Sequence, residues 1–376
     1  MKQKIFILWA SWNVWRELVK QILEKDWIKN HINSSIIIWI ASSSSYIFNS
    51  EAIEKDILNN ISTSRENAVK EFNEKSTKFE KLEYLVELVK ENWLDWEVVF
   101  VDVTAWKEEL LVFHKYVIIN SNNFLVTANK NPISLFSQED FDLLTSYSGR
   151  YNTNTTVMWW AWVLDFVNER TNKIVDTIYS IQWVFSGTLG YILSELSLWK
   201  KDFSVIVKEA KEQGYTEPNP WDDLNWLDVA RKLVILARYS GHSVDISDVI
   251  VELLISEKYW SLEWEEFMKE IKNEDNRFKD LLKKSLEKNE ILSYVWEMNF
   301  DKKNNKLSLK VWLKSVSKNS DLWGLSWTTN LAIVETEILQ NPIPHTIKSR
   351  WAGLEVTAGA VRVGIAKMIP NNITSK

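Results

Sequence analysis

The chain has 376 residues, of which 45% are hydrophobic and 26% charged, a composition typical of globular proteins long enough for two domains. A formal net charge of −6 argues against a nucleic-acid or anionic-membrane partner, since both need basic surfaces. The absence of cysteine excludes disulfides, thiolate metal sites and cysteine nucleophiles. The N-terminus has no signal-peptide pattern and no apolar run is long enough to span a bilayer, so we expect a cytoplasmic protein.

The first part of the chain alternates buried strands with helices. The expected strands are 4–9, 36–41, 98–105 and 124–128, with helices between them. Such alternation predicts a parallel, doubly wound sheet, which binds ligands at the carboxyl ends of its strands. We therefore expect residues 102–104 and 127–130 at the rim of a cofactor site.

The second part mixes strands and helices differently. The expected elements are a strand at 177–185, helices at 187–196 and 222–239, charged helices within 259–290, a hairpin formed by 291–300 and 306–316, a strand near 330–339 and a helix within 351–369. The pattern predicts an α/β protein with two domains. A Rossmann-type dinucleotide-binding domain spans 1–150 and is completed by 340–376. An α+β domain for catalysis and dimerisation spans 151–339.

Tryptophan and glycine occur in abnormal numbers. The chain has 22 Trp and 9 Gly, whereas average usage of roughly 7% would give about 26 glycines in a chain of this length. Together the two types make 31, so the excess of one nearly cancels the deficit of the other.

The positions of the tryptophans are those that favour glycine. Residues 9–15 read WASWNVW between a strand and a helix, and with glycine for tryptophan they read GASGNVG, a variant of the dinucleotide-binding fingerprint. Residues 159–162 would become GGAG, and Trp27 and Trp93 follow helices where a C-cap glycine is expected. Our hypothesis is that UGA codons of this gene encode glycine. The alternative is a protein genuinely rich in tryptophan, and a few residues, such as Trp260 or Trp264, fit a helix as they stand.

Four ordered motifs carry a family resemblance. They are QGYTEPNPWDDLNWLDVARK (213–232), TANKNPIS (127–134), VFSGTLGYI (184–192) and AGLEVTAGAV (352–361). The chain resembles homoserine dehydrogenases, above all the dehydrogenase half of bifunctional aspartokinase–homoserine dehydrogenases. The resemblance implies NAD(P)-dependent interconversion of L-homoserine and L-aspartate 4-semialdehyde, in threonine and methionine biosynthesis, by a homodimer.

The resemblance also implies roles for individual residues. Lys232 is the expected proton-transfer residue, Lys130 a second essential lysine, and Asp228 orients Lys232 or a water. The expected substrate contacts are Glu217, Asp223, Thr188 and Gly187. The expected cofactor contacts are Trp9, Ala10, Ser11, Trp12, Asn13, Val14, Trp15, Ser42, Thr104, Lys130 and Glu355, with glycine in place of the tryptophans.

Taken singly, each of these residues has a plainer explanation. Asp228 and Lys232, four apart on a helix, form a common type of surface pair. Asp223 suits a helix N-cap, and Thr188 suits a helix start. Glu217 fits a turn, and Lys130 is one of many lysines. The functional interpretation rests on all of them matching one family pattern.

The expected cofactor is NADP, with NAD left open. The strand at 36–41 is followed by Ser42 and further serines, where NAD-selective enzymes often have an acidic residue for the ribose hydroxyls. A monovalent cation site stays uncertain, because Asn152 or Asn154 stands where many relatives have an acidic residue.

Two other functions compete with this one. Aspartate-semialdehyde dehydrogenase shares the glycine loop but needs a cysteine nucleophile, which this chain lacks. A non-catalytic pseudoenzyme is the alternative if the tryptophans of the nucleotide loop are genuine.

Overall fold

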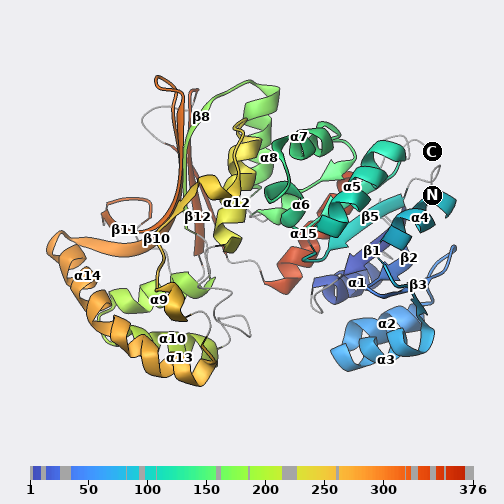
Figure 1. The fold of residues 1–376 in the computed structure, drawn as a ribbon, viewed down its shortest axis with the longest axis horizontal. Coiled ribbons are helices and arrows are strands. Elements are labelled where there is room, and N and C mark those ends of the chain that lie inside the picture. The colour runs from blue at the N-terminus through green and yellow to red at the C-terminus, as the bar shows by residue number, and fades with distance from the viewer. Residues whose placement is uncertain are drawn as a thin grey trace. The chain divides into compact units, whose positions relative to one another are not determined.

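The computed structural model describes residues 3–9, 14–25, 35–81, 83–92, 98–106, 108–157, 162–184, 187–213, 227–259, 262–317, 319–322, 329–338, 344–350 and 353–368. The chain divides into two compact units, each built around its own sheet (Figure 1). Unit 1 comprises residues 1–162 with 352–376, and unit 2 comprises residues 163–351.

Unit 1 contains a seven-stranded sheet in the order β4-β3-β2-β1-β5-β6-β7 among the described residues. Its strands are β1 (Gln3–Trp9), β2 (Ser35–Ala41), β3 (Ser45–Phe48), β4 (Thr77–Lys78), β5 (Val98–Val103), β6 (Phe124–Thr127) and β7 (Tyr151–Asn152). The run from β2 through β7 is parallel, and β3 and β4 extend it as an antiparallel edge. This arrangement confirms the predicted α/β class.

Helices cover both faces of this sheet. They are α1 (Val14–Lys25), α2 (Lys55–Thr63), α3 (Arg65–Lys75), α4 (Glu83–Asn92), α5 (Glu108–Asn120), α6 (Asn131–Ser134), α7 (Gln138–Ser146), the short η1 (Asn154–Thr156) and α15 (Leu354–Lys367). Successive side chains of β1 point to opposite faces of the sheet and so pack against different helices. Ile5 and Ile7 join the core formed with α1 and α15, whereas the ring of Phe6 lies 6.2 Å from that of Phe113 in α5.

Unit 2 contains a six-stranded sheet in the order β13-β12-β8-β10-β11-β9 among the described residues. Its strands are β8 (Ile178–Val184), β9 (Val249–Val251), β10 (Glu290–Asp301), β11 (Lys306–Ser317), β12 (Thr329–Thr336) and β13 (His345–Arg350). Its helices are α8 (Val163–Asn168), η3 (Glu169–Lys173), α9 (Gly187–Ser197), α10 (Phe203–Glu212), α12 (Leu227–Tyr239), η4 (Ile246–Asp248), η5 (Glu257–Tyr259), α13 (Trp264–Glu270), η6 (Ile271–Glu274) and α14 (Asp275–Glu287). The predicted hairpin is β10 paired with β11.

The limits of the units differ from the predicted domain limits in two segments. Residues 151–162 belong to unit 1, because β7 pairs with β6 at the edge of its sheet. Residues 340–351 belong to unit 2, because β13 pairs with β12. The terminal helix α15 lies in unit 1, where Gln21 of α1 donates a hydrogen bond to the carbonyl of Glu355 over 2.9 Å.

Candidate active site

Two buried indoles occupy the first strand–helix junction of unit 1. Trp9 ends β1 and Trp15 lies in the first turn of α1, and their rings stack with centroids 4.7 Å apart. Phe72 of α3 packs edge-on against both. The indole N–H of Trp15 is buried and has no hydrogen-bond partner in the described part of the chain. Val14 begins α1, whereas Ala10, Ser11, Trp12 and Asn13 lie outside the described residues.

These side chains do not fit a dinucleotide. A pyrophosphate binds at such a junction because glycines let the backbone N–H groups approach it. The indoles of Trp9 and Trp15 instead fill the space between β1, α1 and α3. Glycine at both positions would leave that backbone bare, so the misfit concerns the side chains and not the fold.

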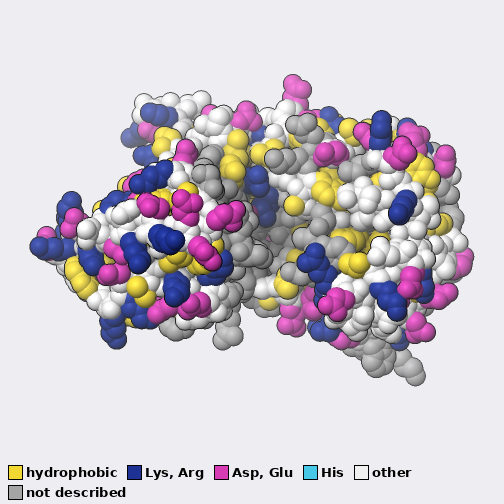
Figure 2. All heavy atoms as spheres, turned by 60° about the horizontal axis from the view of Figure 1, so that its bottom comes forward, with side chains coloured by type: hydrophobic (Ala, Val, Ile, Leu, Met, Phe, Trp, Pro, Cys, Tyr) yellow, Lys and Arg dark blue, Asp and Glu magenta, His cyan; other side chains and the backbone are white. Residues whose placement is uncertain are grey.

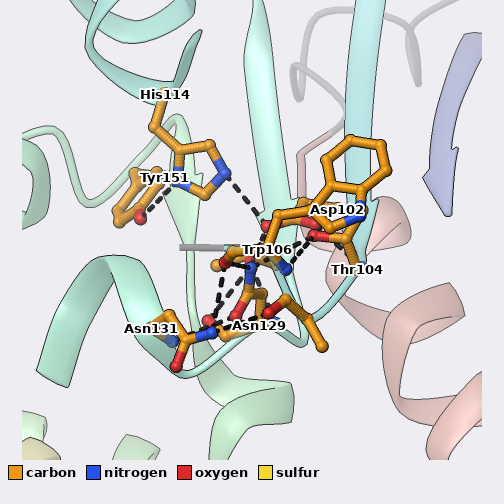
Figure 3. Close-up of polar contacts among 9 residues, drawn as sticks. Asp102, Thr104, Trp106, His114, Asn129, Asn131 and Tyr151 are labelled. Carbon is orange, nitrogen blue, oxygen red and sulfur yellow. Dashed lines mark hydrogen bonds and ion pairs between the residues drawn. The ribbon is translucent and has the colours of Figure 1, made fainter. Parts of the chain in front are cut away.

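Three of the other predicted cofactor residues of unit 1 lie just after strands, and the fourth lies in a helix. Thr104 follows β5 at the carboxyl edge of the sheet (Figure 3). Lys130 follows β6, and because β5 and β6 are parallel neighbours it lies at the same edge. The hydroxyl of Ser42 is engaged within the turn from β2 to β3, where it donates to the carbonyl of Ser45 over 3.0 Å. Glu355 lies exposed in the first turn of α15.

Unit 2 holds the predicted proton-transfer pair. Lys232 and Asp228 lie one turn apart on α12, and the Lys232 Nζ is 2.6 Å from a carboxylate oxygen of Asp228. The same Nζ lies 5.7 Å from the ring centroid of Trp296 on β10. Trp296 pairs in register with Trp183 on β8, and both indoles are buried. The sequence predicted the Lys232–Asp228 pair from its spacing, but it gave no sign of the Trp296 indole near Lys232.

The predicted substrate residues are only partly described. Gly187 begins α9, and Thr188 is buried in its first turn. Glu217 and Asp223 lie outside the described residues.

Two further tryptophans have a backbone conformation that favours glycine. Trp199 lies two residues after the end of α9 with φ +54°, and Trp162 precedes α8 with φ +55°. A left-handed residue at this distance from a helix end is usually glycine, because a Cβ clashes with the neighbouring carbonyl. Trp162 is one of the positions expected from the sequence to favour glycine. Trp199 was not among them, although its place after an expected helix was the available signal.

The charged side chains on one face of unit 2 lie interspersed. Over the face that contains α10, α13 and α14, basic and acidic side chains are interspersed (Figure 2), and several form pairs such as Lys201 with Glu209 and Lys279 with Asp202. The described residues contain no group of three His, Asp or Glu placed to hold a metal. Nor does any helix within the described ranges have the length and apolarity needed to cross a membrane.

Comparison with known proteins assigns the family. The family model described as homoserine dehydrogenase matches residues 164–365. The chain belongs to this family. The bifunctional aspartokinase/homoserine dehydrogenase of Buchnera aphidicola is 31% identical over 296 residues, which cover 76% of this chain and 34% of that protein. The homoserine dehydrogenase of Saccharomyces cerevisiae is 33% identical over 198 residues, which cover 51% of this chain and 54% of that protein.

Solved structures of the homoserine dehydrogenase family share the fold. A hyperthermophilic archaeal homoserine dehydrogenase in complex with NADPH matches with a TM-score of 0.68 and 23% identity, over 99% of both chains. A putative homoserine dehydrogenase from Archaeoglobus fulgidus matches with a TM-score of 0.72 and 22% identity, over 97% of this chain and 99% of that one. At these identities the likeness shows the fold, and the chain spans only part of the curated relatives named above.

Proposed function

We propose that the protein is an NAD(P)-dependent homoserine dehydrogenase, which interconverts L-homoserine and L-aspartate 4-semialdehyde. The observation that carries the proposal is the close pair of Lys232 and Asp228 on α12, within the region that matches the family model. Oxidation of a primary alcohol removes a hydride and a hydroxyl proton, and an ammonium group can return that proton to the aldehyde oxygen in the reverse direction. Lys232 has this role, and Asp228 orients it through the hydrogen bond.

The remaining parts of the proposal follow the family pattern. Lys130 assists at the carboxyl edge of unit 1, Glu217 and Asp223 hold the substrate amine, and Thr188 contacts the substrate. NADP(H) is the preferred cofactor, because Ser42 offers no carboxylate to the ribose hydroxyls. The functional form is a homodimer, as the family resemblance implies. A cytoplasmic location stays a prediction, and a monovalent cation is not part of the proposal.

The proposal requires glycine at the nucleotide junction. We call the full chain as printed the tryptophan form, and the full chain with glycine at every position encoded by UGA the glycine form. Trp199 and Trp162, with their left-handed backbones, support the glycine form. Glycine at Trp296 would also vacate space near Lys232. If the natural polypeptide carries indoles at the junction, the stack of Trp9 on Trp15 favours a non-catalytic protein.

The test has two steps. Sequencing the gene identifies which tryptophan positions are UGA codons, and intact mass of the native protein shows which residue each one encodes. Both purified forms are then assayed for reduction of NADP⁺ and of NAD⁺ with L-homoserine. We expect turnover from the glycine form alone. A native mass that matches 22 tryptophans would remove the glycine hypothesis, and a glycine form that binds NADP(H) without oxidising homoserine would remove the enzymatic assignment.

A further inference from the structure

A fully buried polar network lies at the carboxyl edge of the sheet in unit 1 (Figure 3). Its centre is Asp102 in β5, whose carboxylate accepts three hydrogen bonds. One comes from the backbone N–H of Thr104 over 2.9 Å, and one from the hydroxyl of Thr127 over 3.1 Å. The Nε2 of His114 is the third partner at 3.1 Å, and its Nδ1 lies 3.0 Å from the hydroxyl of Tyr151.

The network continues into the loop after β6. The hydroxyl of Thr127 accepts the backbone N–H of Asn129 over 3.0 Å. The side-chain amide of Asn129 donates to the Thr104 hydroxyl and to the carbonyl of residue 106, over 3.2 Å and 2.9 Å. That of Asn131 donates to the carbonyls of residues 105 and 106, over 3.0 Å and 3.1 Å. Because backbone atoms of residue 106 are used, these bonds do not depend on its side chain.

Lys130 lies between the two asparagines. Its own carbonyl accepts hydrogen bonds from the Ser134 backbone N–H and hydroxyl, over 3.0 Å and 2.7 Å, in the first turn of α6. The backbone of Lys130 is therefore held on both sides, while its side chain is only half-buried. A long flexible side chain that begins at a rigid base loses less freedom when it is placed against a ligand.

We propose that Asp102, His114, Thr127, Asn129 and Asn131 are positioning residues, which hold Thr104 and Lys130 in place at the carboxyl edge of unit 1. This inference rests on the proposed function for the roles of Thr104 and Lys130. None of the five touches substrate in this scheme. They act by fixing the loops after β5 and β6 relative to each other.

The charge of Asp102 strengthens the network. Burial alone raises the pKa of this carboxyl group, but the hydrogen bond and charge of His114, with the N–H and hydroxyl of Thr104, outweigh it and lower the pKa below its usual value. Asp102 is therefore ionised at neutral pH, and hydrogen bonds to an ionised acceptor are shorter and stronger than neutral ones.

Two matched hydroxyl groups allow an experiment that distinguishes a positioning role in turnover from a general contribution to protein stability. Thr127 and Ser121 are both buried near opposite ends of β6, and each accepts the backbone N–H of the asparagine two residues on. Thr127→Val removes the hydroxyl at the carboxyl edge, and Ser121→Ala removes it near the amino end. Both are made in the glycine form, with Thr127→Ser as the variant that keeps the hydroxyl.

We expect both hydroxyl deletions to lower the melting temperature, but only Thr127→Val to impair turnover. Its kcat should fall roughly tenfold to a hundredfold, since small displacements of a catalytic group have effects of that size. The KM for homoserine should change by less than about twofold, because the proposed substrate residues lie in unit 2. Thr127→Ser should restore kcat. Equal kcat values for Thr127→Val and Ser121→Ala would overturn the proposal.

Hydrogen exchange tests the positioning without any activity. In the glycine form, Thr127→Val should speed amide exchange in peptides covering 104–106 and 128–131, whereas Ser121→Ala should leave those peptides unchanged. Unchanged exchange in Thr127→Val would overturn the positioning role even if kcat fell. Faster exchange in a protein that does not turn over homoserine would support the positioning role and count against the proposed function.

Discussion

Trp199 is a residue whose side chain conflicts with its backbone conformation. Its φ of +54° is left-handed and its side chain is 46% exposed, so the indole gains little from burial. The left-handed conformation costs a residue with a Cβ roughly 1–2 kcal/mol. We predict that Trp199→Gly in the tryptophan form raises the free energy of unfolding by about 1 kcal/mol, after allowing for the greater freedom of glycine in the unfolded chain. Urea denaturation measures it.

Trp199→Ala is the control for this prediction. It removes the indole but keeps the Cβ, so the backbone conflict persists and the stability should not rise. A gain as large in Trp199→Ala as in Trp199→Gly would mean that the indole, not the left-handed backbone, was the source of strain.

Lys232 is the residue on which turnover should depend most. Lys232→Ala in the glycine form should lower kcat by roughly 10²–10⁴-fold, the usual contribution of a general acid or base, while circular dichroism and melting temperature stay close to those of the parent. Steady-state kinetics with homoserine and NADP⁺ measure it. The matched control is Lys208→Ala on α10, which removes the lysine of another pair spaced by four, with Glu212. Comparable turnover in the two variants would remove Lys232 from its role.

Whether a contact between two residues could be predicted from the sequence depends on how far apart they lie along the chain. Asp228 and Lys232 are four apart on one helix, so their spacing already predicted the pair. His114 and Asp102 are twelve apart, and only the packing of α5 on the sheet joins them. No spacing in the sequence therefore predicted the contact of His114 with Asp102, or the network around it.

The packing of α15 on the sheet of unit 1 depends on one genuine glycine. An added Cβ at Gly364 would lie 2.7 Å from a methyl carbon of Val126 in β6 and 3.3 Å from the side-chain oxygen of Asn152. Val126 is fully buried and β-branched, so it has little freedom to move. We predict that Gly364→Ala destabilises the protein by about 1–3 kcal/mol, the usual cost of overpacking, measured by urea denaturation.

Gly359 provides the control in the same helix. A Cβ there would meet only the side-chain oxygen of Gln21 at 3.7 Å, an ordinary contact. Gly359→Ala should therefore be neutral or stabilising, by up to about 1 kcal/mol, because alanine favours a helix. If both changes destabilised the protein by a similar amount, the cause would be a general intolerance of α15 for added side chains. The specific contact of Gly364 with Val126 would then not explain the effect.

Elements with strong periodicity were predicted well, and short edge strands were not. The mostly buried β1 and the fully buried β5 matched their apolar runs, and the long hairpin of β10 and β11 matched its alternation. Both β9 and β13 lie at edges of the second sheet and escaped prediction. Strand β9 is apolar but only three residues long, and β13 is polar and has no continuous apolar pattern. Strand β13 also explains the shifted domain limit, because pairing with β12 assigns its residues to unit 2.

At the scale of the whole molecule, cofactor binding should raise the thermal stability of the protein. Units 1 and 2 have separate sheets and separate cores, so a ligand held by unit 1 need stabilise only the unfolding transition that includes this unit. A ligand at a hundred times its Kd adds about 2.7 kcal/mol to the native state. For a unit of this size, that free energy raises the melting temperature by roughly 5–10 °C.

This linkage separates the two forms without any assay of turnover. We predict that saturating NADP⁺ raises the melting temperature of the glycine form and leaves that of the tryptophan form unchanged, because the stack of Trp9 on Trp15 occupies the junction where a pyrophosphate would approach the backbone. Differential scanning calorimetry measures it, and Trp9→Gly with Trp15→Gly in the tryptophan form should restore part of the shift. An equal shift in both unmodified forms would mean that the indoles leave the nucleotide site open. No shift in either would mean that the fold of unit 1 does not bind this cofactor.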